Sequence, residues 1–330
     1  MKEILNRLIN HDILTKEDAK GVLVNIAKGE YNTSQIAAFL TVYMMRSITI
    51  EELEGFRNAL LELCLSIDLS AYNPIDLCGT GGDGKDTFNI STLASFVTAG
   101  AGIKVTKHGN YGVSSKCGSS NVLEFLGIKF SNEADFLTRS IEEAGICVLH
   151  APLFHPAMKN VAPIRRELAV KTFFNMLGPM VNPAFPKNQM VGVFNLELAR
   201  MYGYLYQNTD KNFTVVHALD GYDEISLTGA TKTISNNSEG IINPADFGVN
   251  RIKKSQIVGG ETIEESAKIF MNILEGKGTE AQNNVVCANA GIAIATVNGS
   301  NPKQGFESAK ESLRSGKGLV ALKRLQALSA

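Results

Sequence analysis

The most informative segment of the chain runs from Asp76 to Thr92 and reads DLCGTGGDGKDTFNIST. It begins inside a predicted buried strand, Ile75–Cys78, and leads into a helical pattern that starts near Ser91. Four glycines in six residues allow positive φ angles and a close approach of the backbone to a ligand. The start of the following helix adds unpaired N–H groups and the positive end of its dipole, which together favour phosphate. The spacing matches neither GxxxxGK[ST] nor GxGxxG, so a phosphate loop of another kind is predicted, with a plain strand-to-helix turn as the alternative.

Apolar runs and helical patterns continue to alternate after this segment, and this alternation predicts an α/β domain with a mostly parallel central sheet flanked by helices. Further strands are predicted at Ile103–Thr106, Ile146–Leu149, Met190–Phe194 and Phe213–Leu219. Helices are predicted at Ser91–Ala101, Ser119–Leu126, Glu133–Ala144, Leu196–Tyr206, Thr262–Leu274, Thr279–Val297 and Pro302–Ser315. A polar stretch, Ser235–Gly240, is typical of a loop or hairpin.

The residues before this domain have a different pattern, which predicts a small α-helical domain over residues 1–70. Helix caps are indicated at Thr15, Asn32 and Thr49, each followed three residues later by Asp, Gln or Glu. Tyr72-Asn73-Pro74 then interrupts the helical pattern. A length of 330 residues also favours two structural units, so the α/β domain is assigned to residues 71–330.

A second loop rich in small and basic residues runs from Lys107 to Asn121 and reads KHGNYGVSSKCGSSN. It also leaves a predicted strand and enters a predicted helix. Two lysines, three glycines and many hydroxyl or amide groups give it the donors of an anion site. Because strand ends of a parallel sheet meet at one edge, we expect this loop to face the first one across a single crevice. A serine-rich surface turn is the alternative for this stretch alone.

Acidic residues follow the predicted strand Phe213–Leu219 in the segment DGYDE, Asp220–Glu224. Adjacent carboxylates at a strand end suit Mg²⁺, which binds through few carboxylates, water and ligand phosphates. A solvated acidic turn is the usual role of such a pair. Two phosphate-type loops nearby would need a cation to offset the charge of their ligand, and this favours the metal site.

Two adjacent arginines, Arg165 and Arg166, stand at the start of a helix that is expected to end at Gly178-Pro179. Such an arginine could hold a carboxylate in a bidentate pair, although a surface salt bridge is the commoner role. His108, inside the second loop, is the histidine whose position indicates a site residue. No nucleophile elbow of the form GxSxG is visible.

Composition excludes several classes of protein. Lys and Arg number 32 against 33 for Asp and Glu, and this balance argues against nucleic-acid binding. The longest nearly uncharged apolar stretch, Val285–Val297, has 13 residues and is too short to span a bilayer, so no membrane association is expected. The first residues, MKEIL, do not resemble a secretory signal. Five cysteines without a CxxC pair suit a reduced, cytoplasmic protein and give no zinc site.

Taken in order, these blocks resemble the anthranilate phosphoribosyltransferases of tryptophan biosynthesis, and the resemblance covers essentially the whole chain. The matching blocks are GTGGD at Gly79–Asp83, NIST at Asn89–Thr92, KHGN at Lys107–Asn110, SS at Ser114–Ser115, HPAMKNVAPIRREL at His155–Leu168, FNMLGP at Phe174–Pro179 and DGYDE at Asp220–Glu224. GTGGD alone is shared with the pyrimidine nucleoside phosphorylases, which remain the alternative. A third possibility is a regulatory or DNA-associated relative without this activity. Departures from the family pattern are Tyr111-Gly112, Cys117 and Ala169.

The resemblance implies that the helical domain is completed by a returning stretch near residues 165–190 and that the chain forms a homodimer through its helical parts. It implies transfer of the phosphoribosyl group of 5-phosphoribosyl 1-diphosphate (PRPP) to the amine of anthranilate. Mg²⁺, two ions per subunit, would serve as cofactor, with Ser91, Asp223 and Glu224 as ligands. Anthranilate would contact Gly79, Asn110 and Arg165, with His108 beside it. The residues implied for PRPP are Gly79, Gly82, Asp83, Thr87, Asn89, Ile90, Ser91, Thr92, Lys107, His108, Gly109, Asn110, Tyr111, Gly112, Val113, Ser114, Ser115 and Ser119.

Overall fold

The computed structural model describes residues 1–112 and 117–329, and the chain divides into two compact units. Unit 1 comprises Met1–Ile67 and Ala151–Pro183. Unit 2 comprises Asp68–His150 and Ala184–Ala330. Among the described residues, no helix is both long enough and apolar enough to cross a membrane.

Unit 1 is built from helices, and its N-terminal segment contains the caps that the sequence indicates. Thr15 accepts a hydrogen bond from the Asp18 amide, and Asn32 and Thr49 form reciprocal capping boxes. These caps are therefore confirmed. The first segment contains α1 (Lys2–Ile9), α2 (Lys16–Lys28), α3 (Thr33–Met45) and α4 (Ile50–Leu63). The second contains α8 (Ala151–Phe154), η3 (Pro156–Asn160), α9 (Ala162–Leu168), α10 (Phe174–Leu177) and η4 (Gly178–Met180).

Aromatic packing joins these two segments into one unit. The ring of Phe173, from the second segment, stacks on Phe56 of α4 with centroids 4.4 Å apart. Phe39 and Tyr43 of α3 meet the same Phe173 ring edge-on, at 6.1 and 5.2 Å. Offset and edge-to-face aromatic pairs of this kind stabilise a core beyond the area they bury.

The predicted continuous helix from Arg165 to Gly178 is wrong. Helix α9 ends at Leu168, and Ala169 takes a left-handed conformation with φ of 53°. The chain then turns again, with the Thr172 amide donating to Asn175 Oδ1 at 3.1 Å, before α10 begins at Phe174. Apolar periodicity runs through both helices and so hides the break, because it carries no information about one residue's φ.

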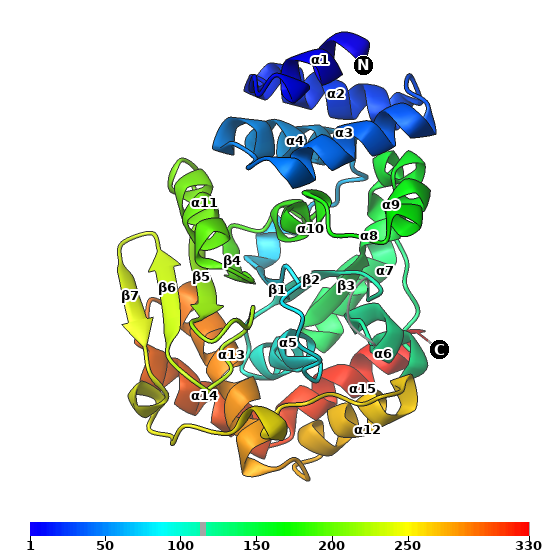
Figure 1. Ribbon diagram of the computed structural model, residues 1–330. Helices are drawn as coiled ribbons and strands as arrows, with labels where there is room; N and C mark the ends of the chain where they lie inside the picture. The colour runs from blue at the N-terminus through cyan, green and yellow to red at the C-terminus, as the bar shows by residue number, and fades with distance from the viewer. Residues whose placement is uncertain (113–116, 330) are drawn as a thin grey trace. The chain divides into compact units, whose positions relative to one another are not determined.

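Unit 2 is centred on a sheet in which the described residues form seven strands in the order β3-β2-β1-β4-β5-β6-β7. The first five strands are parallel to their neighbours, and β6 and β7 are antiparallel at one edge, where Figure 1 shows them as a yellow hairpin. The predicted mostly parallel sheet is confirmed. The strands are β1 (Ile75–Gly79), β2 (Val105–Gly109), β3 (Ile146–His150), β4 (Asn188–Gly192), β5 (Asn212–Ala218), β6 (Thr231–Ser235) and β7 (Glu239–Ile242).

Helices cover both faces of this sheet, as two adjacent residues of β5 demonstrate. The ring of Phe213 contacts Tyr206 of α11 (Leu196–Gln207), whereas the Thr214 hydroxyl bonds Thr296 of α13 (Glu280–Asn298) at 2.7 Å. Successive side chains of a strand point to opposite faces, so α11 and α13 lie on opposite sides. The other helices of the unit are η1 (Ser70–Tyr72), α5 (Ile90–Gly100), α6 (Ser119–Phe125), α7 (Ala134–Arg139), η2 (Ser140–Ala144), η5 (Pro244–Phe247), η6 (Lys254–Gln256), α12 (Ile263–Leu274), α14 (Pro302–Arg314) and α15 (Lys317–Ser329), the last of which was not predicted.

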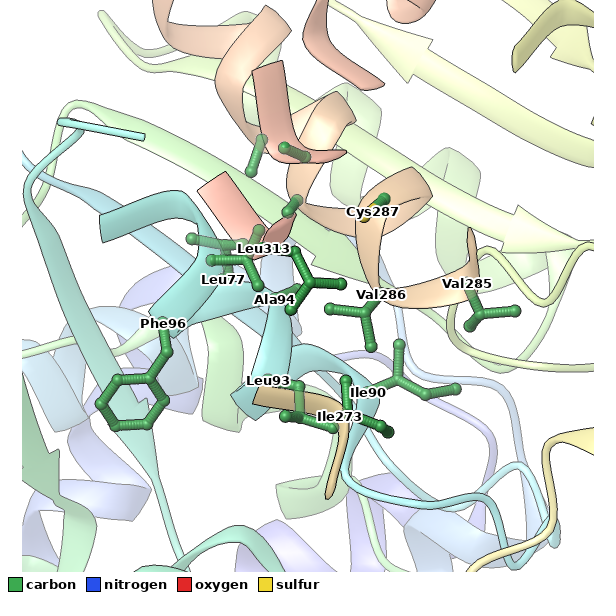
Figure 2. Packing of buried hydrophobic residues seen from close by; sticks show 14 of the residues in the cluster. Leu77, Ile90, Leu93, Ala94, Phe96, Ile273, Val285, Val286, Cys287 and Leu313 are labelled. Atoms are coloured by element: carbon green, nitrogen blue, oxygen red, sulfur yellow. The ribbon is translucent and has the colours of Figure 1, made fainter. Parts of the chain in front are cut away.

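The core of unit 2 fixes α5 and α13 against each other. Figure 2 shows apolar side chains of α5, among them Ile90 and Leu93, in one cluster with Val285 and Val286 of α13. All four side chains are nearly inaccessible to solvent. Close packing of this kind leaves little room for either helix to move, so groups carried by both helices keep fixed positions.

Two glycines on adjacent strands leave room for another part of the chain at the carboxyl edge of the sheet. Gly79 ends β1 and Gly192 ends β4, and the two are directly paired in the parallel ladder. A β-carbon on Gly79 would overlap the Asp223 carboxylate, and one on Gly192 would overlap the Asp223 carbonyl oxygen. The strand order reverses direction between β1 and β4, which is where open α/β sheets bind ligands.

We predict that Gly192→Ala lowers the free energy of unfolding by about 1–3 kcal/mol, because the added methyl group forces the Asp223 backbone out of position. Urea denaturation followed by circular dichroism measures this difference. Gly240→Ala is the matched control, since its β-carbon in β7 would meet nothing nearer than Thr233 Oγ1 at 3.8 Å. Equal losses in the two variants would show that only the strand propensity of glycine matters.

Candidate functional site

The first glycine-rich loop leaves β1 and turns sharply before α5. Gly81, Gly82 and Gly84 have φ angles of 65°, 78° and 71°, which L-residues with side chains rarely adopt. Asp83 closes the turn, its Oδ1 accepting the Lys85 amide at 2.9 Å. The glycines predicted for a phosphate loop are therefore required by the backbone itself.

The acidic segment after β5 meets this loop through two hydrogen bonds. The Gly81 amide donates to Asp223 Oδ2 at 2.6 Å, and the Ser91 amide at the start of α5 donates to Glu224 Oε1 at 3.2 Å. Residues more than 130 positions apart in the sequence are thus joined. The carboxylates are almost buried, with Asp223 7% and Glu224 9% exposed. The predicted convergence of the glycine-rich loop and the DGYDE segment is present.

Burial of these two acids changes their proton affinity. The pKa of Asp223 lies well above its usual range because of burial first, and then because of the charge of Glu224. Burial likewise raises the pKa of Glu224 to about 7, against the opposing effects of Lys107 and of the Ser91 hydrogen bonds. Two adjacent buried carboxylates therefore favour a cation between or beside them.

Lys107 lies on β2 and is 2% exposed. Its ammonium group donates to the Leu77 carbonyl at 3.3 Å, and burial lowers its pKa while the charges of Cys78, Asp76 and Glu224 act in the other direction. The neighbouring His108 amide donates to Asp76 Oδ1 at 3.2 Å. The predicted anion-binding lysine is thus a buried group beside the acidic pair.

One hydrogen bond joins the second loop to the first, and further contacts support the second loop internally. Asn89, before α5, donates from Nδ2 to the Cys117 carbonyl at 3.1 Å. The amides of Gly112 and Gly118 both donate to Asn121 Oδ1, at 3.2 and 3.1 Å. Ser119 Oγ donates to the carbonyl of Asn110 at 3.2 Å, and a β-carbon on Gly109 would lie 2.8 Å from the same Oγ. The two loops are brought together as predicted, while Val113, Ser114 and Ser115 lie outside the described residues.

Other predicted phosphoribosyl residues contribute in different ways. The side chains of Ile90 and Thr92 are 1% exposed, so they face the protein interior and only their backbones can reach a ligand. Thr87 forms an isolated antiparallel bridge with Val258. Tyr111 is exposed, and its ring lies edge-on to His150 with centroids 4.8 Å apart.

The oxygen ligands at this edge of the sheet suit Mg²⁺, and they are too few for a metal ion that is bound entirely by protein side chains. Within residues 1–112 and 117–329, no group of three or more His, Cys, Asp or Glu could hold a metal ion. The structure instead offers two adjacent carboxylates and the Ser91 hydroxyl. Mg²⁺ keeps several waters and binds through one or two carboxylates together with substrate phosphates, which agrees with this set.

Arg165 belongs to unit 1. It lies in the last turn of α9, where Nη2 donates to Asn175 Oδ1 at 3.3 Å and the guanidinium sits over the Phe174 ring at 5.4 Å. Burial lowers its pKa. Arg166 is exposed, so the two arginines differ in environment as their spacing on a helix requires.

Sequence reasoning missed three residues that shape the site. Gly192 makes room for Asp223, but a glycine in a strand does not reveal what approaches it. Asp76 lies within an apolar run, and a buried acid there is a signal that could have been used. Gln189 of β4 donates to Asp76 Oδ2 at 3.4 Å and so supports the same carboxylate.

Comparison with known proteins covers nearly the full chain. The family model described as "Glycosyl transferase family, helical bundle domain" matches residues 2–64, and "Glycosyl transferase family, a/b domain" matches residues 71–319. Anthranilate phosphoribosyltransferase of Flavobacterium psychrophilum is 77% identical over 329 residues, covering 100% of each chain.

Solved structures agree in fold over the same length. The anthranilate phosphoribosyltransferase of Thermus thermophilus superposes with a TM-score of 0.91 at 32% identity, covering 98% of both chains. The enzyme of Saccharomyces cerevisiae, solved with PRPP and Mg, gives 0.90 at 27% identity, covering 98% of this chain and 96% of that one. The yeast enzyme has also been solved with 4-fluoroanthranilate, with a TM-score of 0.87, 26% identity and the same coverage. The nucleoside phosphorylase alternative is not favoured by these relatives. The chain belongs to the anthranilate phosphoribosyltransferase family.

Proposed function

We propose that this protein transfers the phosphoribosyl group of PRPP to the amine of anthranilate, giving N-(5-phosphoribosyl)anthranilate and diphosphate in tryptophan biosynthesis. One observation carries the proposal: a glycine-rich loop and a buried pair of carboxylates are hydrogen-bonded together at the carboxyl edge of the sheet. The loop suits the phosphates of PRPP, and the carboxylates suit the cation that accompanies them.

The chemistry places opposite demands on the two ends of the breaking bond. Loss of diphosphate leaves positive charge on C1 of the ribose while negative charge grows on the leaving group. The start of α5 and the Lys107 ammonium supply positive potential for the phosphates, in a site already shaped before substrate binds. Mg²⁺, held by Asp223, Glu224 and Ser91, would neutralise part of the diphosphate charge when bound.

The acceptor requires orientation more than activation. The amine of anthranilate is an aniline nitrogen, neutral and nucleophilic near pH 7, so no strong base is needed before attack. Arg165 is the proposed partner of the anthranilate carboxylate, with Gly79 and Asn110 as further contacts and His108 beside the acceptor. Holding the amine in line with C1 converts two reactants into one assembled pair, which lowers the entropic part of the barrier.

We assign the remaining PRPP contacts by the same reasoning. Backbone groups suit the positions with buried or absent side chains, and hydroxyl and amide side chains suit the others. The assigned residues are Gly79, Gly82, Asp83, Thr87, Asn89, Ile90, Ser91, Thr92, Lys107, His108, Gly109, Asn110, Tyr111, Gly112, Val113, Ser114, Ser115 and Ser119. Two Mg²⁺ ions per subunit are proposed, since the diphosphate and the acidic pair each offer oxygen ligands.

We also propose that the chain forms a homodimer through its helical parts and has a cytoplasmic location. We further propose a helical domain of residues 1–70, completed by a stretch near 165–190, and an α/β domain of residues 71–330. Exposed apolar side chains in unit 1 support the dimer, since Ile9 is 62% and Met45 82% exposed. Five free cysteine thiols support a reducing compartment.

A direct assay tests the function. Anthranilate is fluorescent, and its signal should fall when protein, PRPP and Mg²⁺ are all present, but not when any one is omitted. Cleavage of pyrimidine nucleosides by phosphate, with no use of anthranilate, would instead establish the phosphorylase alternative.

We predict that Asp223→Asn combined with Glu224→Gln abolishes turnover at ordinary Mg²⁺ concentrations. The amide oxygens can still accept from Gly81 and Ser91, so the fold remains, but the anionic ligands are lost. Without Mg²⁺ the melting temperature should be equal or higher, because two buried like charges have been removed. Asp246→Asn, an exposed acid at η5, is the control for a simple change of charge. Full activity of the double variant across a Mg²⁺ titration would contradict the metal assignment.

We predict that Arg165→Ala raises KM for anthranilate and leaves KM for PRPP far less affected. A charge-assisted hydrogen bond contributes roughly 1.5–3 kcal/mol, so kcat/KM for anthranilate should fall on the order of 10- to 150-fold. Arg166→Ala is the neighbouring control, because that side chain is exposed and points about 100° away around the helix. Steady-state kinetics with each substrate varied separately measures both effects. An equal loss in the two variants would indicate damage to α9 and not recognition of the acceptor.

A further inference from the structure

The segment that carries the acidic pair is a closed loop with internal supports. At its neck the Leu219 amide donates to the Ala230 carbonyl at 2.8 Å. Inside it Thr228 Oγ1 donates to Asp220 Oδ2 at 2.6 Å. These bonds close the loop on itself, but they do not attach its middle, where Asp223 and Glu224 lie, to the rest of the unit.

Besides the Gly81 and Ser91 amides, which hold the two carboxylates, this middle is attached by Asn289, a residue of α13 that is 1% exposed. Its Oδ1 accepts the Ile225 amide at 3.0 Å, and its Nδ2 donates to the Ile225 carbonyl at 2.9 Å. The second amide hydrogen is satisfied by the Val285 carbonyl of the same helix, also at 2.9 Å. Both backbone groups of Ile225 are therefore held by one side chain that is itself tied to its helix.

Two bonds to one residue define a position and an orientation, which a single bond does not. Ile225 directly follows Glu224, so its backbone direction sets where the preceding carboxylates point. The clamp is rigid because α13 is packed in the core, where Val285 and Val286 lie with Ile90 of α5 (Figure 2). On the other side the Ser91 amide of α5 holds Glu224 itself. Two helices fixed against each other thus hold Glu224 and the residue that follows it.

We propose that Asn289 is a positioning residue: through Ile225 it holds Asp223 and Glu224 in the geometry that binds Mg²⁺ with the diphosphate of PRPP. It touches neither substrate nor metal. The part of the proposal that concerns Mg²⁺ and PRPP rests on the proposed function, whereas the clamp itself does not.

Hydrogen exchange of the ligand-free protein tests the clamp without reference to activity. Asn289→Leu keeps the branched shape and the number of side-chain heavy atoms and removes every bond to Ile225. Amides of residues 219–230 should then exchange about 5- to 50-fold faster, as expected when buried hydrogen bonds are lost locally. Asn289→Ser, which is smaller and admits water, provides a second variant if Asn289→Leu does not fold.

Thr296→Val is the matched control on the same helix. Thr296 is buried, and its hydroxyl bonds the Ile292 carbonyl and Thr214, so its loss costs stability away from the acidic loop. Faster exchange at 219–230 in the Asn289 variants but not in Thr296→Val supports the clamp. Unchanged exchange at 219–230, or equal change in Thr296→Val, overturns it.

Binding and kinetics then test the consequence. The Mg²⁺ concentration needed for half-maximal PRPP binding, measured by calorimetry, should rise at least about tenfold in Asn289→Leu, while KM for anthranilate stays within about twofold. An unchanged Mg²⁺ requirement alongside faster exchange would overturn the positioning role. If the wild type showed no transfer to anthranilate, the proposed function would fall, but the exchange result would still decide the clamp.

Discussion

The site depends on one steric constraint, the absence of side chains where β1 and β4 end. Because Gly79 and Gly192 are paired in the ladder, the backbone and carboxylate of Asp223 can lie directly against two adjacent strands. A carboxylate at that place reaches the Gly81 amide, and its neighbour Glu224 reaches the Ser91 amide. Any larger residue at either position would displace the acidic segment and break the connection to the glycine-rich loop. The chemistry of the edge is therefore a consequence of packing at two positions.

The same arrangement has an electrostatic cost that a ligand can offset. Asp223, Glu224, Asp76 and Lys107 are all nearly buried, and a buried charge is stable only with partners. The neighbouring strands β1 and β2, which pair at Ile75 and Val105, supply these partners for Asp76 and Lys107. The Asp76 carboxylate accepts a hydrogen bond from the His108 amide, and the Lys107 ammonium donates one to the Leu77 carbonyl. Burial instead raises the pKa of both Asp223 and Glu224, and the charge of Glu224 raises that of Asp223 further, so their charge is only partly compensated within the protein. Excess negative charge beside a phosphate loop is physically reasonable only where a cation joins the two.

Sequence reasoning succeeded where the signal is local and failed where it depends on distant neighbours. Glycines followed by a helix, carboxylates after a strand, and cap residues such as Thr49 all express their role within a few positions. The roles of Gly192 and Asn289 are not visible in the nearby sequence, where one is a glycine in a strand and the other an asparagine in an apolar helix. Their roles depend on Asp223 and Ile225, which only the fold brings into contact with them. The break at Ala169 was hidden for a related reason, since apolar spacing continues across a single left-handed residue. Local chemistry could be predicted, whereas the supports that give it a fixed geometry could not.

Those supports are distributed unevenly, and the difference matches what each loop must do. The acidic segment is fastened to α13 by two buried bonds and to α5 by a part-buried one, and the core holds these two helices together. The second loop is tied by Asn89 and Asn121 through partly exposed bonds, which cost less to open. A transferase of this kind needs its cation ligands in place before the diphosphate arrives, because ordering them afterwards would consume binding energy. It also needs at least one side of the site to release product. The acids are anchored to helices of the core, so the cation ligands are in place before substrate binds. The basic, glycine-rich segment is held by weaker bonds, so this side of the site can open to release product.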